Sequence, residues 1–236
     1  MNRIELIRKE EKKYHDSCYE NYKLFEEGSW LHKPVKTVID LIPLFMGKDN
    51  LKILDLGSGV GRNSIPLAEA VKEKGGKVIC VDLLDSALQK LIKYSEKFNV
   101  KEVIQAEKAD IGNYDIKPKY FDLIVAVSSL EHVQSELIFE KVVQQMAEGT
   151  KYNGINCIIV NSEVEEIDLA NDKKLDALME INISTHAMIS KLKKLYNDWE
   201  LLDVRVKPLK YNIVRDQRSI LLKSNAITYI VRNNNL

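Results

Sequence analysis

The stretch KILDLGSGVGRNSIPLA, Lys52 to Ala68, decides the fold of this chain. It begins with an apolar strand pattern, passes through a turn with three glycines, and continues with apolar residues at helical spacing. Glycine suits such a turn because it adopts positive φ angles and lacks the Cβ that would keep a ligand off the backbone. The helix that follows offers unpaired N–H groups and a partial positive charge to an anionic group. This strand, glycine turn and helix indicate a nucleotide-type site in an open α/β sheet.

The length and charge of the chain limit what it can be. At 236 residues it suits one α/β domain with a small appendage. Lys and Arg together number 35, as do Asp and Glu, so no net field recruits nucleic acid or an anionic membrane. We therefore expect a small-molecule substrate, with no nucleic-acid partner and no membrane partner. A monomer and a homodimer both remain open.

Cysteine usage and the opening residues point to the cytoplasm. Cys18, Cys80 and Cys157 are odd in number and far apart, which is typical of reduced thiols. The opening MNRIELIRKEEKKY has no apolar core, so we expect no secretory signal. No apolar run approaches the roughly 18 residues that span a bilayer. We expect a cytoplasmic location.

The first part of the chain reads as a helical arm. Apolar residues at helical spacing predict one helix or two short ones over residues 2–25, and a further helix over 35–45 that Pro43 interrupts. We therefore divide the chain into an arm, residues 1–46, and a domain, residues 47–236. The arm is rich in rings, which either pack the helices onto the sheet or form a lid over a substrate. The ring-bearing candidates for substrate contact are Tyr14, Tyr22, Trp30 and His32.

The rest of the chain alternates strands and helices. The predicted strands are 51–56, 77–81, 103–106, 121–127, 154–160, 199–206 and 220–231, with helices between most of them. Such alternation implies a parallel sheet with helices on both faces. The acidic stretch 163–176 is expected to be a connection rather than a strand.

Four segments, taken together, resemble the class I S-adenosylmethionine-dependent methyltransferases. They are ILDLGSGVGR at 53–62, VICVDLLDSAL at 78–88, KADI at 108–111 and FDLIVAVSSLEHV at 121–133. The resemblance runs from about Lys33 to the end and implies a Rossmann-like fold with a seven-stranded, mostly parallel sheet and an antiparallel C-terminal strand. GRNS and LKKLYNDWELL are similar to the tellurite-resistance TehB-type branch, whereas SSLEHV is more like generic small-molecule methyltransferases.

The resemblance implies S-adenosylmethionine as cofactor and S-adenosylhomocysteine as product. By this resemblance the cofactor lies on the bare backbone of the glycine turn, and the helix start faces its methionine carboxylate. The residues concerned are Gly57, Ser58, Gly59 and Gly61 for the turn, and Arg62 and Asn63 for the helix start. Asp55 accepts from the cofactor ammonium or, alternatively, caps the turn.

The remaining cofactor positions follow the second and third segments. Asp82 stands at the tip of a strand, where a carboxylate accepts both ribose hydroxyls; the alternative is an N-cap for the next helix. Asp110 accepts from the adenine amino group or forms a turn. Leu83 and Ile111 cover the ring, and Ile111 also donates its N–H to a ring nitrogen. Ala109 and Ser128 complete the predicted cofactor set.

The loop after the fourth predicted strand is the candidate site of chemistry. Methyl transfer from a sulfonium is an in-line displacement, so the protein mainly holds the nucleophile in place. A base matters only where the nucleophile arrives protonated. His132 is the first candidate base and Glu131 the second; alternatively, both organise the loop or line the cofactor site.

Other functions remain to be weighed. A dinucleotide oxidoreductase would need glycine where Arg62 stands. A non-catalytic cofactor-binding or partner-binding domain, and a methyltransferase acting on RNA or protein, stay open. A late cluster of basic residues is either a solvated face or selects an anionic substrate; its members are Arg205, Lys207, Lys210, Arg215, Arg218 and Lys223. The four histidines show no paired spacing, so no metal site is expected.

Overall fold

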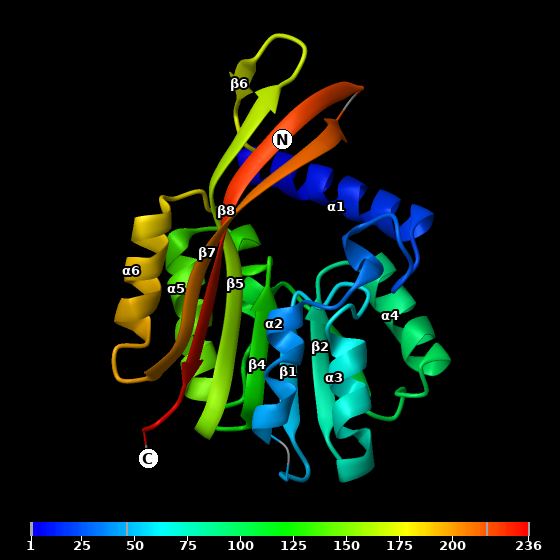
Figure 1. Cartoon of the computed structure of the whole chain (residues 1–236), viewed down its shortest axis with the longest axis vertical. Coiled ribbons are helices and arrows are strands. Elements are labelled where there is room, and N and C mark those ends of the chain that lie inside the picture. The colour runs from blue at the N-terminus through cyan, green and yellow to red at the C-terminus, as the bar shows by residue number, and fades with distance from the viewer. Residues whose placement is uncertain (1, 46, 216, 236) are drawn as a thin grey trace.

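The computed structural model describes residues 2–45, 47–215 and 217–235 of the chain. Figure 1 shows a central twisted sheet with helices around it. The strands are β1 (Lys52–Leu56), β2 (Lys77–Asp82), β3 (Ile104–Lys108), β4 (Phe121–Val127), β5 (Thr150–Asp168), β6 (Lys173–Leu175), β7 (Glu200–Arg215) and β8 (Arg218–Arg232). The helices are α1 (Arg3–Asn21), α2 (Lys36–Ile39), α3 (Ser64–Val71), α4 (Asp85–Lys97), α5 (Glu136–Gly149) and α6 (Thr185–Leu195).

The sheet confirms the predicted Rossmann-like topology. Over the described residues its strand order is β3-β2-β1-β4-β5-β8-β7, and β6 pairs with β5 off this path. Strands β1 to β5 are parallel to their neighbours along this path, whereas β8 is antiparallel to both β5 and β7. The chain reverses its direction of travel across the sheet between β1 and β4. Ligands of open α/β sheets bind in the crevice at the carboxyl ends of the strands beside such a reversal.

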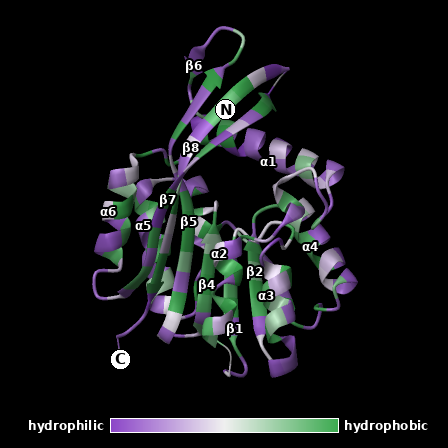
Figure 2. Cartoon of the chain, in the orientation of Figure 1, coloured by the Kyte–Doolittle hydropathy of each residue, from purple (hydrophilic) through white to green (hydrophobic). Residues whose placement is uncertain are grey.

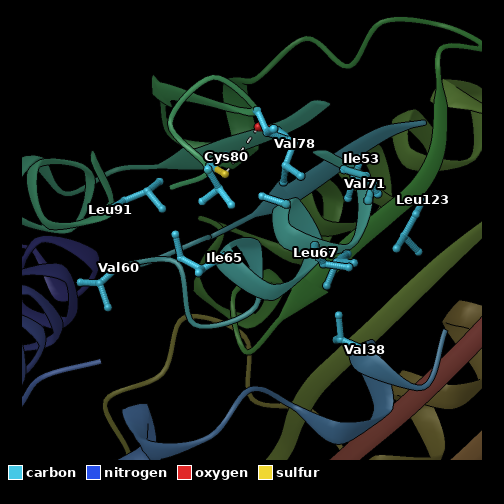
Figure 3. Close-up of a cluster of buried hydrophobic side chains, with 14 of the residues drawn as sticks. Val38, Ile53, Val60, Ile65, Leu67, Val71, Val78, Cys80, Leu91 and Leu123 are labelled. Carbon is cyan, nitrogen blue, oxygen red and sulfur yellow. Dashed lines mark hydrogen bonds between the residues drawn. The ribbon is translucent and has the colours of Figure 1, made fainter. Parts of the chain in front are cut away.

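Helices cover both faces of the sheet, as the alternation predicts. One buried cluster lies between the sheet and α2, α3 and α4; Figure 3 shows part of it, with Val38, Ile65 and Leu91 among the side chains. A second cluster joins the opposite face to α5 and α6 through residues such as Phe139 and Met188. The hydrophobic colouring of the central strands in Figure 2 matches their burial between these two layers.

The far end of the sheet is longer than the sequence indicates. Strands β5, β7 and β8 continue past the domain and form, with β6, a twisted antiparallel projection that Figure 1 shows beside α1. We call residues 163–175, 205–215 and 217–225 the β-extension. The expected connection at 163–176 is wrong, because β5 runs to Asp168 and β6 follows at Lys173–Leu175. The expected end of the next strand near residue 206 is also wrong, because β7 runs to Arg215.

The N-terminal arm is one long helix followed by short turns. Asn2 and Glu5 form a capping box at the start of α1. The second predicted helix is short: α2 ends at Ile39, and a 3-10 turn at Ile42–Phe45 contains Pro43. Within the described residues, we find no helix with the length and apolar character needed to cross a membrane.

Candidate active site

The glycine turn has the shape that the sequence predicts. Gly57, Gly59 and Gly61 have φ angles of +75°, +54° and +93°, which disfavour other residues. A Cβ on Gly57 would lie 2.4 Å from the Ser129 Cβ, and one on Gly61 would lie 2.5 Å from the Leu91 Cδ1. Both glycines therefore allow close packing beneath the turn. Gly59 instead faces the arm, since a Cβ there would lie 3.1 Å from the Tyr19 hydroxyl.

Ser58 and Asp82 supply polar atoms at the same turn. Ser58 is 6% exposed, and its Oγ has no hydrogen-bond partner among the described residues. Asp82 accepts from the N–H of Gly59 at 2.7 Å and from the N–H of Leu84 at 2.9 Å. Burial raises the pKa of the Asp82 carboxyl, and these N–H groups oppose the rise. A carboxylate has further lone pairs, so Asp82 keeps acceptor capacity for two ribose hydroxyls.

These features fit S-adenosylmethionine. The turn offers bare backbone, an unpartnered hydroxyl and a carboxylate at the tip of β2. The alternative role of Asp82 as the N-cap of α4 does not match the geometry, because Leu84 is the N-cap and no side chain caps that helix. The ribose contact itself stays a prediction.

Asp55 is tied to the helix that follows the turn. Its Oδ2 accepts from the Ser64 Oγ–H at 2.6 Å, at the first residue of α3. Asp55 is 1% exposed, and this burial raises its pKa to about 6, although the Ser64 bond opposes the rise. Asp55 thus connects the end of β1 to the start of α3. Contact with the cofactor ammonium stays a prediction.

The predicted adenine region lies beyond β2 and β3. Leu83 is 44% exposed, so its side chain is free to contact a ring. The N–H of Ala109 donates to the carbonyl of Asp82 at 3.1 Å, which joins the two loops. Asp110 caps the short turn that begins at Ile111, and its Oδ1 accepts from the N–H of Gly112. The turn-forming alternative for Asp110 is therefore present, while its adenine contact stays a prediction.

The side chains of Arg62 and Asn63 face the arm. Arg62 donates through Nε to the carbonyl of Lys33 at 2.6 Å, and its guanidinium lies over the Trp30 ring at 5.6 Å. Asn63 Oδ1 accepts from the N–H of Val35 at 3.0 Å. The backbone at these two positions and the terminal guanidinium nitrogens of Arg62 are left for the predicted contact with the methionine carboxylate. Their side chains fasten the arm to the start of α3.

The loop after β4 is held tightly at the end of β5. Ser128 has a φ of +50°, a conformation that costs a non-glycine residue energy and that occurs often at functional sites. Glu131 is fully buried, and its Oε1 accepts from the backbone N–H of Asn161 at 3.0 Å and from its Nδ2 at 2.7 Å. Its Oε2 has no partner among the described residues. Burial raises the pKa of the Glu131 carboxyl. Glu131 therefore organises this loop and keeps one free acceptor.

His132 lies among carboxylates. Its Nδ1 is 3.1 Å from Glu180 Oε2 and 3.7 Å from Glu11 Oε2. Burial alone would lower the pKa of His132, but Glu11, Glu180 and Glu131 outweigh it and raise the pKa to about 9. The ring is therefore an imidazolium at neutral pH and has no free nitrogen to accept a proton. With α1 lying over the site, this environment opposes a role of His132 as a base. That role stays a prediction.

A polar seam on α1 lies across the whole site. We use this name for Arg8, Glu11, His15 and Tyr19, whose spacing places them on one face of the helix. Arg8 donates to Asp110 Oδ2 at 2.9 Å and lies 3.8 Å from Glu180. The His15 Nε2 lies 3.5 Å from Glu11 Oε2. Burial would raise the pKa of Glu11, yet His132 and His15 outweigh it and lower the pKa. The seam thus joins the adenine region, the glycine turn and the loop after β4.

The predicted substrate residues divide into two groups. Tyr14 and Trp30 join His15 and Tyr19 in one cluster of rings, with centroid distances of 5.4 to 6.3 Å. Tyr22 instead lies against Gly28, and His32 is 3.9 Å from Glu27. For the described residues, no hydrogen bond or ion pair links Tyr22 or His32 to the glycine turn or to the loop after β4. The structure brings only the first group to the site.

Sequence reasoning missed the polar seam, Asn161 and Glu180. A signal for the seam is nevertheless present in the sequence. Arg8, Glu11 and His15 are interleaved at helical spacing with the buried residues Ile7, Cys18 and Tyr19. Charged residues on the buried side of a helix indicate partners across a site. Glu180 and Asn161 carry no such signal, because only folding brings them to His132 and Glu131.

Known proteins are similar to this chain over half of its length or more. A protein-lysine N-methyltransferase of Saccharomyces cerevisiae is 24% identical over 135 residues, which cover 52% of this chain and 58% of that protein. A ribosomal RNA small subunit methyltransferase G of Mesomycoplasma hyopneumoniae is 25% identical over 181 residues, 73% of this chain and 86% of that protein. The solved structure of TehB from Haemophilus influenzae has a TM-score of 0.62 and 21% identity, and covers 93% of this chain and 66% of that one. The match thus spans less than two thirds of the yeast protein and of TehB, and the likeness to TehB shows the fold.

A family model described as a methyltransferase domain matches residues 47–233. This span contains the glycine turn, the carboxylates of β1 and β2 and the loop after β4. The chain therefore belongs to the methyltransferase domain family.

Proposed function

We propose that this enzyme transfers a methyl group to a small-molecule nucleophile held between the N-terminal arm and the loop after β4. The observation that supports a small acceptor is the polar seam. It spans the site from Arg8 on Asp110 to Tyr19 on Gly59, so α1 lies over the crevice. A small acceptor fits beneath such a helix, whereas a macromolecule needs the crevice open. The division into an arm, residues 1–46, and a domain, residues 47–236, is part of this proposal.

The cofactor-binding roles follow from the geometry of the turn. When bound, S-adenosylmethionine supplies a methyl group already activated on a sulfonium. Asp82 accepts the ribose hydroxyls, and the backbone of the glycine turn allows close approach. Ser58 contributes its unpartnered hydroxyl. Leu83 and Ile111 contact the adenine ring, and Asp110 is shared between Arg8 and the adenine amino group.

The loop after β4 orients the acceptor. Holding a nucleophile in line with the methyl group is worth up to ~7–11 kcal/mol of the barrier. Glu131 and Asn161 fix this loop, and protonated His132 donates a hydrogen bond to the acceptor. For a nucleophile that arrives protonated, the free Oε2 of Glu131 is the better acceptor of the proton, because His132 already carries one.

Two other functions compete with this proposal. The names of the two relatives refer to protein lysine and to ribosomal RNA, which favours a macromolecular acceptor. A domain that binds the cofactor without catalysis is the second, because the cofactor residues alone would serve it. We further propose a cytoplasmic location, which the three buried free thiols support.

One experiment separates these functions. The purified chain is incubated with S-adenosylmethionine labelled in its methyl group and, in parallel, with small amines, thiols, hydroxy acids and chalcogen oxyanions, with total RNA, and with unmethylated cell protein. We expect label in at least one small molecule and none in RNA or protein. Label only in RNA or protein would overturn the small-molecule acceptor. No label anywhere, with S-adenosylmethionine still bound, would favour the non-catalytic domain.

A further inference from the structure

Arg62 is a half-buried cation without an acidic partner. Its Nε donates to the Lys33 carbonyl, and its guanidinium lies on the Trp30 ring. No carboxylate of the described residues forms an ion pair with it. The terminal nitrogens of a guanidinium form a fork that suits a planar oxyanion. This fork lies at the entrance of the crevice, beside the glycine turn. We therefore expect it to bind an anionic group from outside the chain.

Lys207 faces the same crevice from the edge strand. Asn161 on β5 pairs with Ala226 on β8, and Ala226 pairs with Lys207 on β7. Residues directly opposite one another in antiparallel strands lie on the same face of the sheet. The Asn161 amide contacts Glu131, so this face overlooks the loop after β4. Only the small side chain of Ala226 stands between Asn161 and Lys207. Lys207 is exposed, and it too lacks an ion-pair partner among the described residues.

Tyr211 links this face to the arm. It lies on the same side of β7 as Lys207, four residues further along, and is 51% exposed. Burial lowers the pKa of Arg62, and the Tyr211 phenol opposes the shift. The same phenol also affects the pKa of Tyr14. Tyr211 is therefore within electrostatic range of Arg62 and Tyr14. Figure 1 shows the β-extension and α1 above the same ends of the central strands.

Two other cations of the β-extension, Arg205 and Arg215, have carboxylate partners. Arg205 pairs with Asp203 at 2.6 Å, and Arg215 is bound by both oxygens of the buried Glu166. Lys210 lies on the opposite face, across from Lys223. Arg218 lies opposite Arg215 on the same face and also has no carboxylate partner among the described residues, but it stands at the start of β8, beyond Arg215. Of the described cations without a carboxylate partner, Lys207 is the one in register with Ala226 and Asn161, and Arg62 is the one beside the glycine turn.

We propose that Arg62 and Lys207 bind an oxyanion group, a carboxylate or a phosphate, on the methyl acceptor. This inference rests on the proposed transfer to a small molecule and names the class of that molecule. Arg62 contacts the oxyanion through its fork, and Lys207 adds a point charge from the other side. Tyr14, Trp30 and Tyr211 contact the apolar part of the acceptor. The nucleophilic end then reaches the loop after β4.

Binding of simple probes tests the proposal without a known substrate. Calorimetry is done on the chain saturated with S-adenosylhomocysteine, with benzoate and phenyl phosphate as anionic probes and benzamide and benzyl alcohol as neutral ones. We expect at least one acid to bind about ten-fold more tightly than its neutral counterpart, the scale of one charge-assisted contact. Arg62→Gln and Lys207→Gln should each remove most of that preference. Lys210→Gln, on the opposite face of the same strand, should leave it unchanged.

Three results would overturn the proposal. They are equal binding of acids and neutral probes, no binding of any probe, and an equal effect of the Lys207 and Lys210 substitutions. Comparing benzoate with phenyl phosphate separates a carboxylate site from a phosphate site. Affinity for S-adenosylhomocysteine is measured first in every variant. If the wild-type chain does not bind S-adenosylhomocysteine, the proposed function itself is contradicted. If it binds S-adenosylhomocysteine but shows no preference for the acids, only the oxyanion site is contradicted.

Discussion

Asp82 is the residue whose role the structure makes most testable. Its two oxygens already accept from Gly59 and Leu84, so a ribose would add to an anchored carboxylate. We expect Asp82→Ala to weaken S-adenosylmethionine binding by ~1.5–3 kcal/mol, the scale of hydrogen bonds to a charged group. Calorimetry measures the loss of affinity for S-adenosylmethionine. The matched control is Asp85→Asn, at an exposed acidic residue at the start of α4. Wild-type affinity in the folded Asp82→Ala variant would refute the ribose contact.

Substitution of His132 tests whether this residue positions the acceptor or binds the cofactor. Its contacts are to Glu11 and Glu180, not to the glycine turn. We therefore expect His132→Ala to slow methyl transfer by about 10²-fold, the scale for loss of one hydrogen-bond donor at the reacting group, while cofactor affinity changes less than about three-fold. Single-turnover transfer and calorimetry give the two values. Equal losses in both would make His132 a residue of the cofactor site alone.

At the scale of elements, polar contacts along α1 hold this helix over the site. Arg8 makes the partly buried ion pair with Asp110. We expect Arg8→Gln to speed the dissociation of S-adenosylhomocysteine by about five- to ten-fold, because a hydrogen bond to a charged group is lost from the closed arm. Stopped-flow dissociation measures the rate. Lys9→Gln, on the exposed side of the same helix, is the control; an equal effect of both would show that α1 does not close the site.

Prediction from sequence succeeded where patterns are local and failed where pairing is distant. The apolar runs of β1 and β4 and the glycines at 57, 59 and 61 follow from residue type and spacing alone. The length of β7 does not, because its exposed second half is extended only through its register with β8. The same reason hides Glu180 and Asn161, which lie 48 and 30 residues along the chain from their partners His132 and Glu131. Position in the chain assigns Asn63 to the cofactor, and it gives no sign that the Asn63 side chain accepts from the N–H of Val35.

At the scale of the whole molecule, the charge on His132 links stability to pH. Its pKa in the folded chain, about 9, exceeds the usual value near 6.5. The stabilisation is therefore fully present below pH 6.5 and is lost as the pH rises through 9. We expect the wild type to exceed His132→Gln in free energy of unfolding by roughly 1–3 kcal/mol at pH 6, and by much less above pH 9. Urea unfolding at both pH values measures this difference, and a constant difference would contradict the raised pKa.

The long edge of β7 has a consequence for solubility. An unpaired strand edge offers a row of N–H and C=O groups that invites another chain to pair with it, and so promotes aggregation. β7 exposes Val204, Val206 and Val214, which would strengthen such pairing. Pro208 in the middle of the strand has no N–H to donate, and the charged Lys207 and Lys210 flank it. Pro208, Lys207 and Lys210 therefore interrupt the unpaired edge of β7 at its centre. Because of this interruption, the strand can be long enough to border the crevice without promoting association between sheets.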